Sequence, residues 1–228
     1  MAGSPTNPFD RGPAEAAEYD AWYDTRRGHA VLQIEQRCVR GLLQGAPRPW
    51  LDLGTGSGRF GGGLRADLGL DPALDLLKIA SKRMPRVVCG VAEMLPVRSA
   101  SIGTVLAVAV FEFLAGPAEA TREVARVLRP GGDFVLGFFP RGGPWAAAYE
   151  KRARDPQSVF HNARFLSITD VQTLAAESGL RPTGARSALF EDPDGSQGDR
   201  VAIGADAMAG FVAIKLTKPT QKERHPYE

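Results

Sequence analysis

Hydrophobic residues along the chain follow two spacings, one typical of amphipathic helices and one of buried strands, and the two alternate. Apolar residues at helical intervals run from Val31 to Leu42, and Gly45 with Pro47 ends that pattern. Short apolar runs bounded by glycine, proline or aspartate then indicate strands. The pattern predicts, in order, a helix over 30–43, strands over 50–53 and 67–70, a helix carrying Leu74, Leu77 and Ala80, a strand over 87–91, a short helix or loop over 93–101, a strand over 104–110, a helix opened by Pro117, a strand over 134–139, a helix capped by Ser167 and Asp170, and strands near 184–190 and 211–216.

Five successive strand–helix units are typical of a parallel sheet, because parallel neighbours need a crossover connection between them. The last two expected strands enclose a Gly/Asp-rich loop over 191–210, and we expect them to form an antiparallel pair at the sheet edge. The prediction is therefore an α/β, doubly wound, mostly parallel seven-stranded sheet with helices on both faces. Such sheets bind ligands beyond the carboxyl ends of their strands, where the strand order reverses.

Composition narrows the class of protein without naming a function. The chain has 228 residues, 43% hydrophobic and 24% charged, which is ordinary for one globular domain. Lys plus Arg number 28 against 26 Asp plus Glu, so the net charge does not favour nucleic acid as a partner. Two cysteines, Cys38 and Cys89, suit buried packing in a reducing compartment, and no apolar run suggests a membrane span or a signal peptide. We expect a cytoplasmic protein.

The glycine-rich segment after the first expected strand carries the main chemical signal. Residues 51–58 read LDLGTGSG, and glycines at a strand-to-helix turn let a nucleotide approach the backbone. The dinucleotide fingerprint G-x-G-x-x-G is not met, and no Lys-Ser/Thr pair follows as in a phosphate-binding Walker loop. Asp71 ends the second strand, where a carboxylate can accept both ribose hydroxyls of an adenosine, although Asp before Pro72 also fits an ordinary turn.

Four segments in this order resemble the class I S-adenosylmethionine-dependent methyltransferases, and especially the small-molecule group that includes the ubiquinone and menaquinone biosynthesis enzymes. They are LDLGTGSG at 51–58, GLDP at 69–72, AEMLP at 92–96 and LRPGG at 128–132. The resemblance covers nearly the whole chain. It implies a Rossmann-like fold with S-adenosylmethionine as cofactor.

The resemblance also implies roles for individual residues. Gly54 and Gly56 would lie beside the methionine part of the cofactor with Asp52 near its ammonium group, and Asp71 would bind the ribose. Ala92 and Glu93 would border the adenine, and Ala109 would line the methyl-transfer site. Tyr19 and Tyr23 resemble the N-terminal tyrosine-bearing helix that folds over the cofactor, although an aromatic helix packed on the sheet fits them equally well. Two departures from the family pattern are Val91, where an acid often binds the adenine amino group, and Gly103, where an Asp commonly begins the fourth strand.

The sulfonium methyl group is already activated, so the enzyme's main task is to align the acceptor and exclude water. A general base is optional, and His161 in the expected lid and Glu112 after the fourth strand are the candidates. A hydrogen-bonded lid histidine and a solvated or capping glutamate are the structural alternatives for these two residues. No carboxylate cluster suggests a metal site.

The predicted function is metal-independent methyl transfer to an O, N, S or C atom of a small organic molecule, by a monomer or homodimer. One alternative is an RNA methyltransferase, for which Arg141, Arg152, Arg154 and Arg164 would supply a basic surface. Another is a cofactor-binding protein without transfer activity. We expect a single domain over 1–228 composed of a flexible arm (1–9), an N-terminal helical cap (10–45), a cofactor-binding core (46–140), a substrate lid (141–166), a C-terminal helix and strand pair (167–217) and a mobile tail (218–228).

Overall fold

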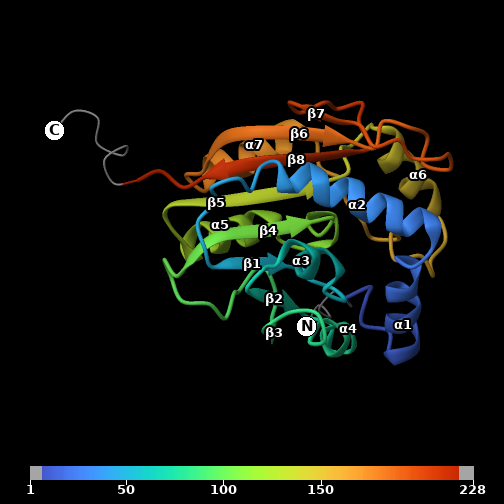
Figure 1. Cartoon of the computed structure of the whole chain (residues 1–228), viewed down its shortest axis with the longest axis horizontal. Coiled ribbons are helices and arrows are strands. Elements are labelled where there is room, and N and C mark those ends of the chain that lie inside the picture. The colour runs from blue at the N-terminus through green and yellow to red at the C-terminus, as the bar shows by residue number, and fades with distance from the viewer. Residues whose placement is uncertain (1–6, 221–228) are drawn as a thin grey trace.

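A computed structural model describes residues 7–220 of the chain, and within them eight strands form one sheet with helices on both faces (Figure 1). The sheet order is β3-β2-β1-β4-β5-β8-β6-β7. The helices are α1 (Pro13–Trp22), α2 (Arg26–Arg40), α3 (Arg59–Leu64), α4 (Leu74–Ala80), the 3-10 helix η1 (Phe111–Phe113), α5 (Pro117–Val127), α6 (Pro144–Arg152) and α7 (Ile168–Glu177). The strands are β1 (Trp50–Leu53), β2 (Leu68–Asp71), β3 (Val87–Cys89), β4 (Ile102–Val108), β5 (Leu128–Phe138), β6 (Arg181–Ala188), β7 (Val201–Ile203) and β8 (Phe211–Thr217). The α/β class is as predicted.

The parallel half of the sheet brings the ends of β1 and β4 together. β1 pairs in parallel with β2 on one side and with β4 on the other, and β3 and β5 extend the two sides. The chain leaves β1 toward β2 and later returns to β4 on the opposite side, so the strand order reverses between these two strands. The carboxyl ends of β1 and β4 therefore flank the crevice where doubly wound sheets bind ligands.

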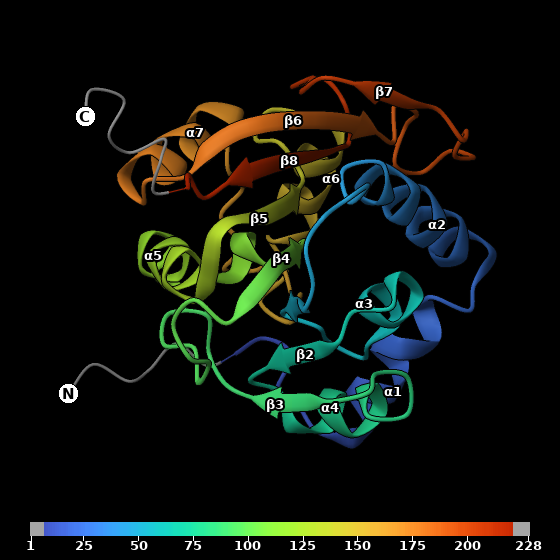
Figure 2. The ribbon, with the colours of Figure 1, turned by 60° about the vertical axis from the view of Figure 1, so that its left-hand side comes forward.

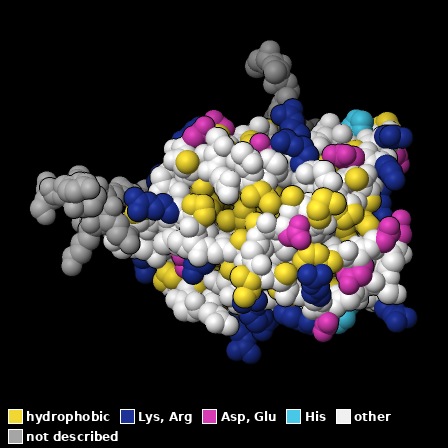
Figure 3. All heavy atoms as spheres, turned by 90° about the horizontal axis from the view of Figure 1, so that it is seen from above, with side chains coloured by type: hydrophobic (Ala, Val, Ile, Leu, Met, Phe, Trp, Pro, Cys, Tyr) yellow, Lys and Arg dark blue, Asp and Glu magenta, His cyan; other side chains and the backbone are white. Residues whose placement is uncertain are grey.

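The antiparallel half contains the expected strand pair and one strand more. β6 and β8 are antiparallel neighbours as predicted, β8 is also antiparallel to β5, and β7 adds an eighth strand at the edge beyond β6. The seven-strand prediction missed β7 because its three residues lie in the Gly/Asp-rich loop and show no buried face, with Ile203 88% exposed. From above, Lys and Arg side chains are interspersed with Asp and Glu around a central apolar strip (Figure 3).

Helices lie on both faces of the sheet (Figure 2), and alternating side chains along the strands divide the core into two layers, one on each face. Val105 and Ala107 of β4 pack toward α5 and α7, whereas Leu106 between them packs toward the layer formed with α2 and α3. The same alternation recurs in β5 and β8. Burial on both faces explains why β4 reads as a continuous apolar run in the sequence.

Two helix boundaries show how local sequence sets the elements. The predicted capping pair of α7 is confirmed, because the Ser167 hydroxyl accepts a hydrogen bond from the Asp170 amide and the Asp170 carboxylate accepts one from the Ser167 amide. α2 begins four residues earlier than the predicted helix over 30–43, because the Thr25 hydroxyl accepts a hydrogen bond from the Gly28 amide and caps it there.

Phe9, Lys218 and Cys89 lie in surroundings that differ from those expected. Of the expected arm over 1–9, residues 1–6 lie outside the described part, and Phe9 packs edge-on against Tyr19 and Phe113. Of the expected tail over 218–228, residues 221–228 lie outside it, and Lys218 donates to the Ala125 and Leu128 carbonyls. Cys38 is buried as expected, but Cys89 is exposed because β3 ends the sheet.

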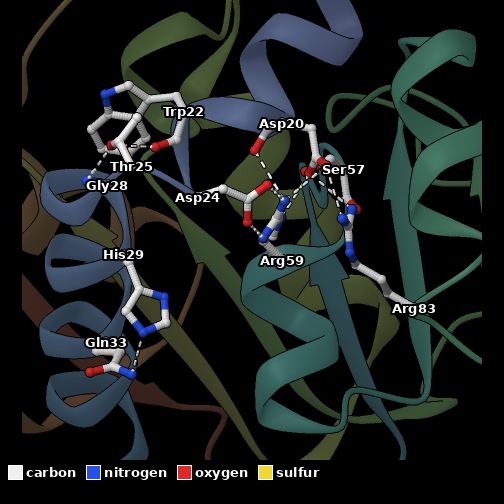
Figure 4. A network of polar contacts seen from close by, with 10 residues as sticks. All are labelled: Asp20, Trp22, Asp24, Thr25, Gly28, His29, Gln33, Ser57, Arg59 and Arg83. Atoms are coloured by element: carbon white, nitrogen blue, oxygen red, sulfur yellow. Dashed lines mark hydrogen bonds and ion pairs between the residues drawn. The ribbon is translucent and has the colours of Figure 1, made fainter.

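Helix α1 is held over the sheet mainly by charge. Ala16 is its one fully buried residue, so apolar packing contributes little. Asp20 near its end accepts hydrogen bonds from the guanidinium groups of Arg59 and Arg83, four contacts of 2.8–3.0 Å (Figure 4). Arg59 also pairs with Asp24, and Arg83 donates to the Ser57 carbonyl. Burial alone would raise the pKa of Asp20, but the two arginines more than offset it and hold that pKa well below its usual range.

We predict that Asp20→Asn loosens α1 without unfolding the sheet. The substitution removes the negative charge between two guanidinium groups and should cost about 2 kcal/mol locally. Hydrogen exchange of the amides in α1, followed by mass spectrometry, should accelerate more than exchange in β4. The matched control is Asp24→Asn, because the Asp24 side chain is 65% exposed and pairs with Arg59 alone. Equal protection of α1 in wild type and Asp20→Asn would contradict the prediction.

Candidate functional site

The glycine loop after β1 adopts a left-handed backbone that side chains would disrupt. Gly54 has a φ of 71° and Gly56 a φ of 53°. A side chain on Gly54 would overlap the Val110 side chain, and one on Gly56 would approach the Tyr19 hydroxyl to 3.3 Å. The two glycines therefore allow a close approach to the loop backbone from the side of β4 and α1.

Asp71 at the end of β2 fixes this loop from the other side. Its carboxylate accepts one hydrogen bond from the Gly56 amide and one from the Ala73 amide, each 2.8 Å long. The side chain is buried, and burial raises its pKa despite these two bonds. A carboxylate offers about four lone-pair sites, so Asp71 retains capacity for two further donors.

A cavity of about 1150 Å³ opens above these two elements, at the carboxyl ends of β1, β2 and β4. The glycine loop and Asp71 line one part of it, and α1, α2 and the segment 161–164 line the rest. The sequence-predicted site residues that line it are Tyr19, Tyr23, Gly54, Gly56, Asp71, Ala92, Glu93, Ala109 and His161. The structure thus brings together residues that are far apart in the chain.

Strained backbone marks the end of β4. Ala109 has a φ of 52°, which non-glycine residues adopt rarely, and its amide donates to the Gly137 carbonyl of β5 at 2.8 Å. The chain turns sharply there and places Val110 against Gly54. Ala109 and Val110 therefore form the wall of the cavity that faces the glycine loop.

Two tyrosines of the N-terminal region reach into the cavity from above. The hydroxyls of Tyr19 and Tyr23 lie 3.1 Å apart in a hydrogen bond. Burial is the largest cause that raises the pKa of Tyr19 to about 12, and the pKa of Tyr23 is also well above its ordinary value. Both hydroxyls stay protonated at neutral pH, and because one donates its hydrogen to the other, the second can donate a hydrogen bond to a ligand.

His161 lies at the cavity mouth with an exposed side chain. Its Nδ1 lies 2.9 Å from the Ala153 carbonyl, which only accepts, so the neutral tautomer that fits this contact has its hydrogen on Nδ1 and its lone pair on Nε2. The neighbouring Phe160 stacks on Tyr149 of α6 with ring centroids 4.2 Å apart, which holds the expected lid segment against the domain. His161 is therefore placed to accept a proton at Nε2.

Two predicted residues, Asp52 and Glu112, do not line the cavity. The Asp52 carboxylate turns under the loop and accepts a hydrogen bond of 2.6 Å from the Thr55 hydroxyl, and burial raises its pKa to about 7. Glu112 is buried, and one carboxylate oxygen accepts from the Phe139 amide at 2.9 Å while the other has no partner among the described residues. Burial raises the pKa of Glu112 to about 7. Both carboxyls act on the protein rather than on a ligand in the cavity.

The sequence reasoning missed Glu35, which does line the cavity. Glu35 lies on the buried stripe of α2 with Val31 and Cys38, is 7% exposed, and forms no hydrogen bond or ion pair with any residue in 7–220. Burial first, and the charge of Glu112 second, raise its pKa to about 8. The available signal was its position at helical spacing among the apolar residues of 30–43, where a carboxylate is out of place.

Residues 7–220 contain neither a metal-binding cluster nor a membrane-spanning helix. Within 7–220, no three His, Cys, Asp or Glu side chains lie close enough together to hold a metal ion. No helix in the same region is both long and apolar enough to cross a lipid bilayer.

Known proteins are similar to this chain both in the region around the glycine loop and over nearly its whole length. Residues 51–136 match a family described as "Methyltransferase domain". An uncharacterised protein of Mycobacterium tuberculosis (strain H37Rv) is 38% identical over 94% of this chain and 76% of its own length. A malonyl-(acyl-carrier protein) O-methyltransferase of Marinomonas sp. is 32% identical over 59% of this chain and 51% of that protein.

A solved structure from Thermotoga maritima is similar over nearly its whole length. It is a SAM-dependent methyltransferase, described as a possible histamine N-methyltransferase, with a TM-score of 0.82 and 29% identity. The similarity covers 92% of this chain and 98% of that one.

We predict that Gly54→Ala is more destabilising than Gly179→Ala, although the two glycines share nearly the same φ, 71° and 70°. A methyl group at Gly179 meets nothing within 4 Å, so it costs only the backbone strain of about 1 kcal/mol. At Gly54 the methyl group must also displace Val110, which should at least double that cost. Urea unfolding of both variants measures the difference. Equal free energies of unfolding would show that Val110 yields without cost.

We also predict that the ligand-free protein becomes less stable as the pH rises from about 5 to 8. A carboxyl whose folded pKa is raised binds a proton more tightly when folded, so its stabilising effect is complete below the unfolded value near 4.5 and is lost through the folded pKa near 7. Each such group contributes a slope of up to about 1.4 kcal/mol per pH unit. Glu112→Gln should flatten this dependence, and the exposed Glu150→Gln should not. Rising stability across this range would refute the assignment.

Proposed function

We propose that this chain, which belongs to the class I S-adenosylmethionine-dependent methyltransferases, transfers a methyl group to an O, N, S or C atom of a small organic molecule. Its cofactor is S-adenosylmethionine. One observation carries the proposal: a single cavity connects the glycine loop and Asp71 with a chamber under α1, α2 and the segment 161–164. Cofactor and acceptor can therefore meet inside the protein.

The residues present fit the cofactor. Gly54 and Gly56 line the cavity with backbone alone, and we assign the space beside them to the methionine part. Asp71 has two lone-pair sites left after binding Gly56 and Ala73, which matches the two hydroxyls of a ribose. Ala92 and Glu93 line the next part of the cavity, where the adenine would lie, and the exposed Val91 beside them offers no acid to its amino group.

The chain contributes mainly position and exclusion of water. S-adenosylmethionine supplies an activated methyl group on a positively charged sulfur. Ala109 and Val110 form the wall opposite the glycine loop, and the protonated hydroxyls of Tyr19 and Tyr23 close the cavity from α1. Nε2 of His161 is a candidate to take a proton from the acceptor at the mouth. Asp52 and Glu112 have no role at the reacting atoms in this proposal, because neither lines the cavity.

The size of the cavity favours a small acceptor. Pockets for one small ligand typically have volumes of about 300–1000 Å³, so about 1150 Å³ leaves room for a cofactor and a second small molecule. The similar protein of Thermotoga maritima is described as a possible histamine N-methyltransferase, which supports the same class of acceptor. The thiols of Cys38 and Cys89 are both free, which fits the cytoplasmic setting that we propose.

Two of the four arginines considered for the RNA alternative lie close to aspartates. Of the arginines considered for it, Arg141 pairs with Asp170 and Arg152 lies 3.8 Å from Asp194. The surface seen in Figure 3 carries both signs of charge rather than a basic patch. The remaining alternative, a protein that binds the cofactor without transferring a methyl group, differs from our proposal in turnover alone.

We predict that Asp71→Ala weakens the binding of S-adenosylhomocysteine by about 2 kcal/mol, roughly 30-fold, in a calorimetric titration. The matched control is Asp67→Ala at the opposite end of β2. The Asp67 carboxylate also accepts a backbone hydrogen bond, from the Trp50 amide, but it lies away from the cavity. Asp67→Ala should therefore lower stability and leave affinity unchanged. Equal affinity in wild type and Asp71→Ala would remove Asp71 from the ribose site, and binding of NAD instead would contradict the proposed cofactor.

A further inference from the structure

Glu35 is a buried carboxyl group in the cavity for which the described part of the protein supplies no donor. Its side chain is 7% exposed, lines the cavity, and forms no hydrogen bond or ion pair with a residue in 7–220. A buried carboxyl group without a partner is unfavourable, and its ordinary fate in evolution is replacement by an apolar residue. A ligand that donates hydrogen bonds to it would remove the penalty.

The titratable groups around Glu35 do not compensate it. Tyr19 and Tyr23 lie near Glu35 on the α1 side, Tyr149 on α6, Glu112 on η1, and Cys38 one turn further along α2. Burial is the main cause that raises the pKa of each of these five groups. The charge of Glu35 raises the pKa of the three tyrosines and of Cys38 further. The Glu112 carboxyl in turn destabilises the ionised form of Glu35. These groups are neutral or acidic, so the partner that Glu35 lacks is a cation or a strong hydrogen-bond donor.

Glu35 is related to α6 as well as to the tyrosine pair. The Tyr19 hydroxyl lies near Gly56, and the charges of Asp71 and Glu35 both raise the pKa of Tyr19. The charge of Glu35 also raises the pKa of Tyr23, whose hydroxyl contacts that of Tyr19, and of Tyr149 in α6. We therefore assign Glu35 to the part of the cavity near α6, where the acceptor would bind.

We propose that Glu35 is the specificity residue of this site, binds the amino group of the acceptor, and makes the protein a methyltransferase of small amines. The proposal rests on the proposed function above. It narrows the acceptor atom from O, N, S or C to nitrogen. Aromatic walls from Tyr23 and Phe60 suit such a ligand, because an ammonium group is also attracted to aromatic faces.

The proton balance fits this assignment. An amine enters as an ammonium ion and pairs with the ionised Glu35 carboxylate. The carboxylate then takes one proton, which leaves a neutral amine with a lone pair on nitrogen. That lone pair forms the N–C bond as the C–S bond breaks, and the bonding electrons return to sulfur. The product leaves as a methylammonium ion, and Glu35 releases its proton to solvent. A carboxyl whose pKa is raised to about 8 is well matched to this exchange near neutral pH.

The test uses the full chain saturated with S-adenosylhomocysteine and titrated calorimetrically at pH 7 with three probes: 2-phenylethylamine, histamine and the uncharged 2-phenylethanol. We expect at least one amine to bind at least tenfold more tightly than the alcohol. Binding should release about one proton, because Glu35 must ionise to pair with the ammonium group. Titrations in buffers of different ionisation enthalpy measure that proton, and a purely structural Glu35 would not release it.

The variant Glu35→Gln keeps the shape of the side chain and removes its charge. We expect it to weaken amine binding at least tenfold, abolish the proton release, and change S-adenosylhomocysteine affinity less than twofold, which also reports correct folding. The exposed Glu150→Gln is the matched control and should behave as wild type.

Three results would overturn the inference: no preference for either amine over the alcohol, equal amine affinity in Glu35→Gln, or a loss of S-adenosylhomocysteine affinity instead. The last would assign Glu35 to the amino group of the cofactor. Failure of wild type to bind S-adenosylhomocysteine at all would refute the proposed function itself, so the two failures are distinguishable.

Discussion

The Asp20 carboxylate, shared between the guanidinium groups of Arg59 and Arg83, is the contact on which the closed cavity depends (Figure 4). Arg59 is the first residue of α3 and directly follows the glycine loop, and Arg83 also donates to the Ser57 carbonyl within that loop. The same two arginines therefore fix the cap and the loop together. Because α1 packs on α4 through only a small apolar cluster, the position of Tyr19 and Tyr23 depends on this charged contact as well as on packing.

The glycine loop and the end of β4 show a second constraint, in the backbone. Gly54 and Ala109 both adopt a left-handed φ, and each follows a strand of the central parallel pair. Hydrogen bonds to neighbouring strands hold both residues in place, from the Gly54 amide to Leu70 and from the Ala109 amide to Gly137. Strain of this kind persists only where the surroundings enforce it, and it gathers at functional sites. Here it accompanies the sharp turns that follow β1 and β4, at the edge of the sheet where the cavity lies.

Local sequence was enough for the parts of the fold that local chemistry determines. The apolar run of β4 and the capping pair of α7 were predictable, since burial on both faces and a reciprocal cap each leave a direct pattern. Gly54, Gly56 and Asp71 were also found, because the loop needs particular residues at fixed spacing. β7 and the exposure of Cys89 could not be predicted, because both depend on the order of the strands in the sheet. A three-residue edge strand such as β7 also shows no hydrophobic periodicity in the sequence.

The carboxyl groups show where sequence reasoning stops. Asp52, Glu112 and Glu35 are all buried with raised pKa values, but only the folded arrangement shows which of them meets the cavity. Asp52 accepts a hydrogen bond from the Thr55 hydroxyl and Glu112 accepts one from the Phe139 amide, so both bind groups of the protein itself. Glu35 has no such partner and lies in the acceptor chamber. A carboxyl group retained without a partner on the buried face of α2 departs from the pattern of a packed helix, and such departures are expected where a ligand supplies the missing contact.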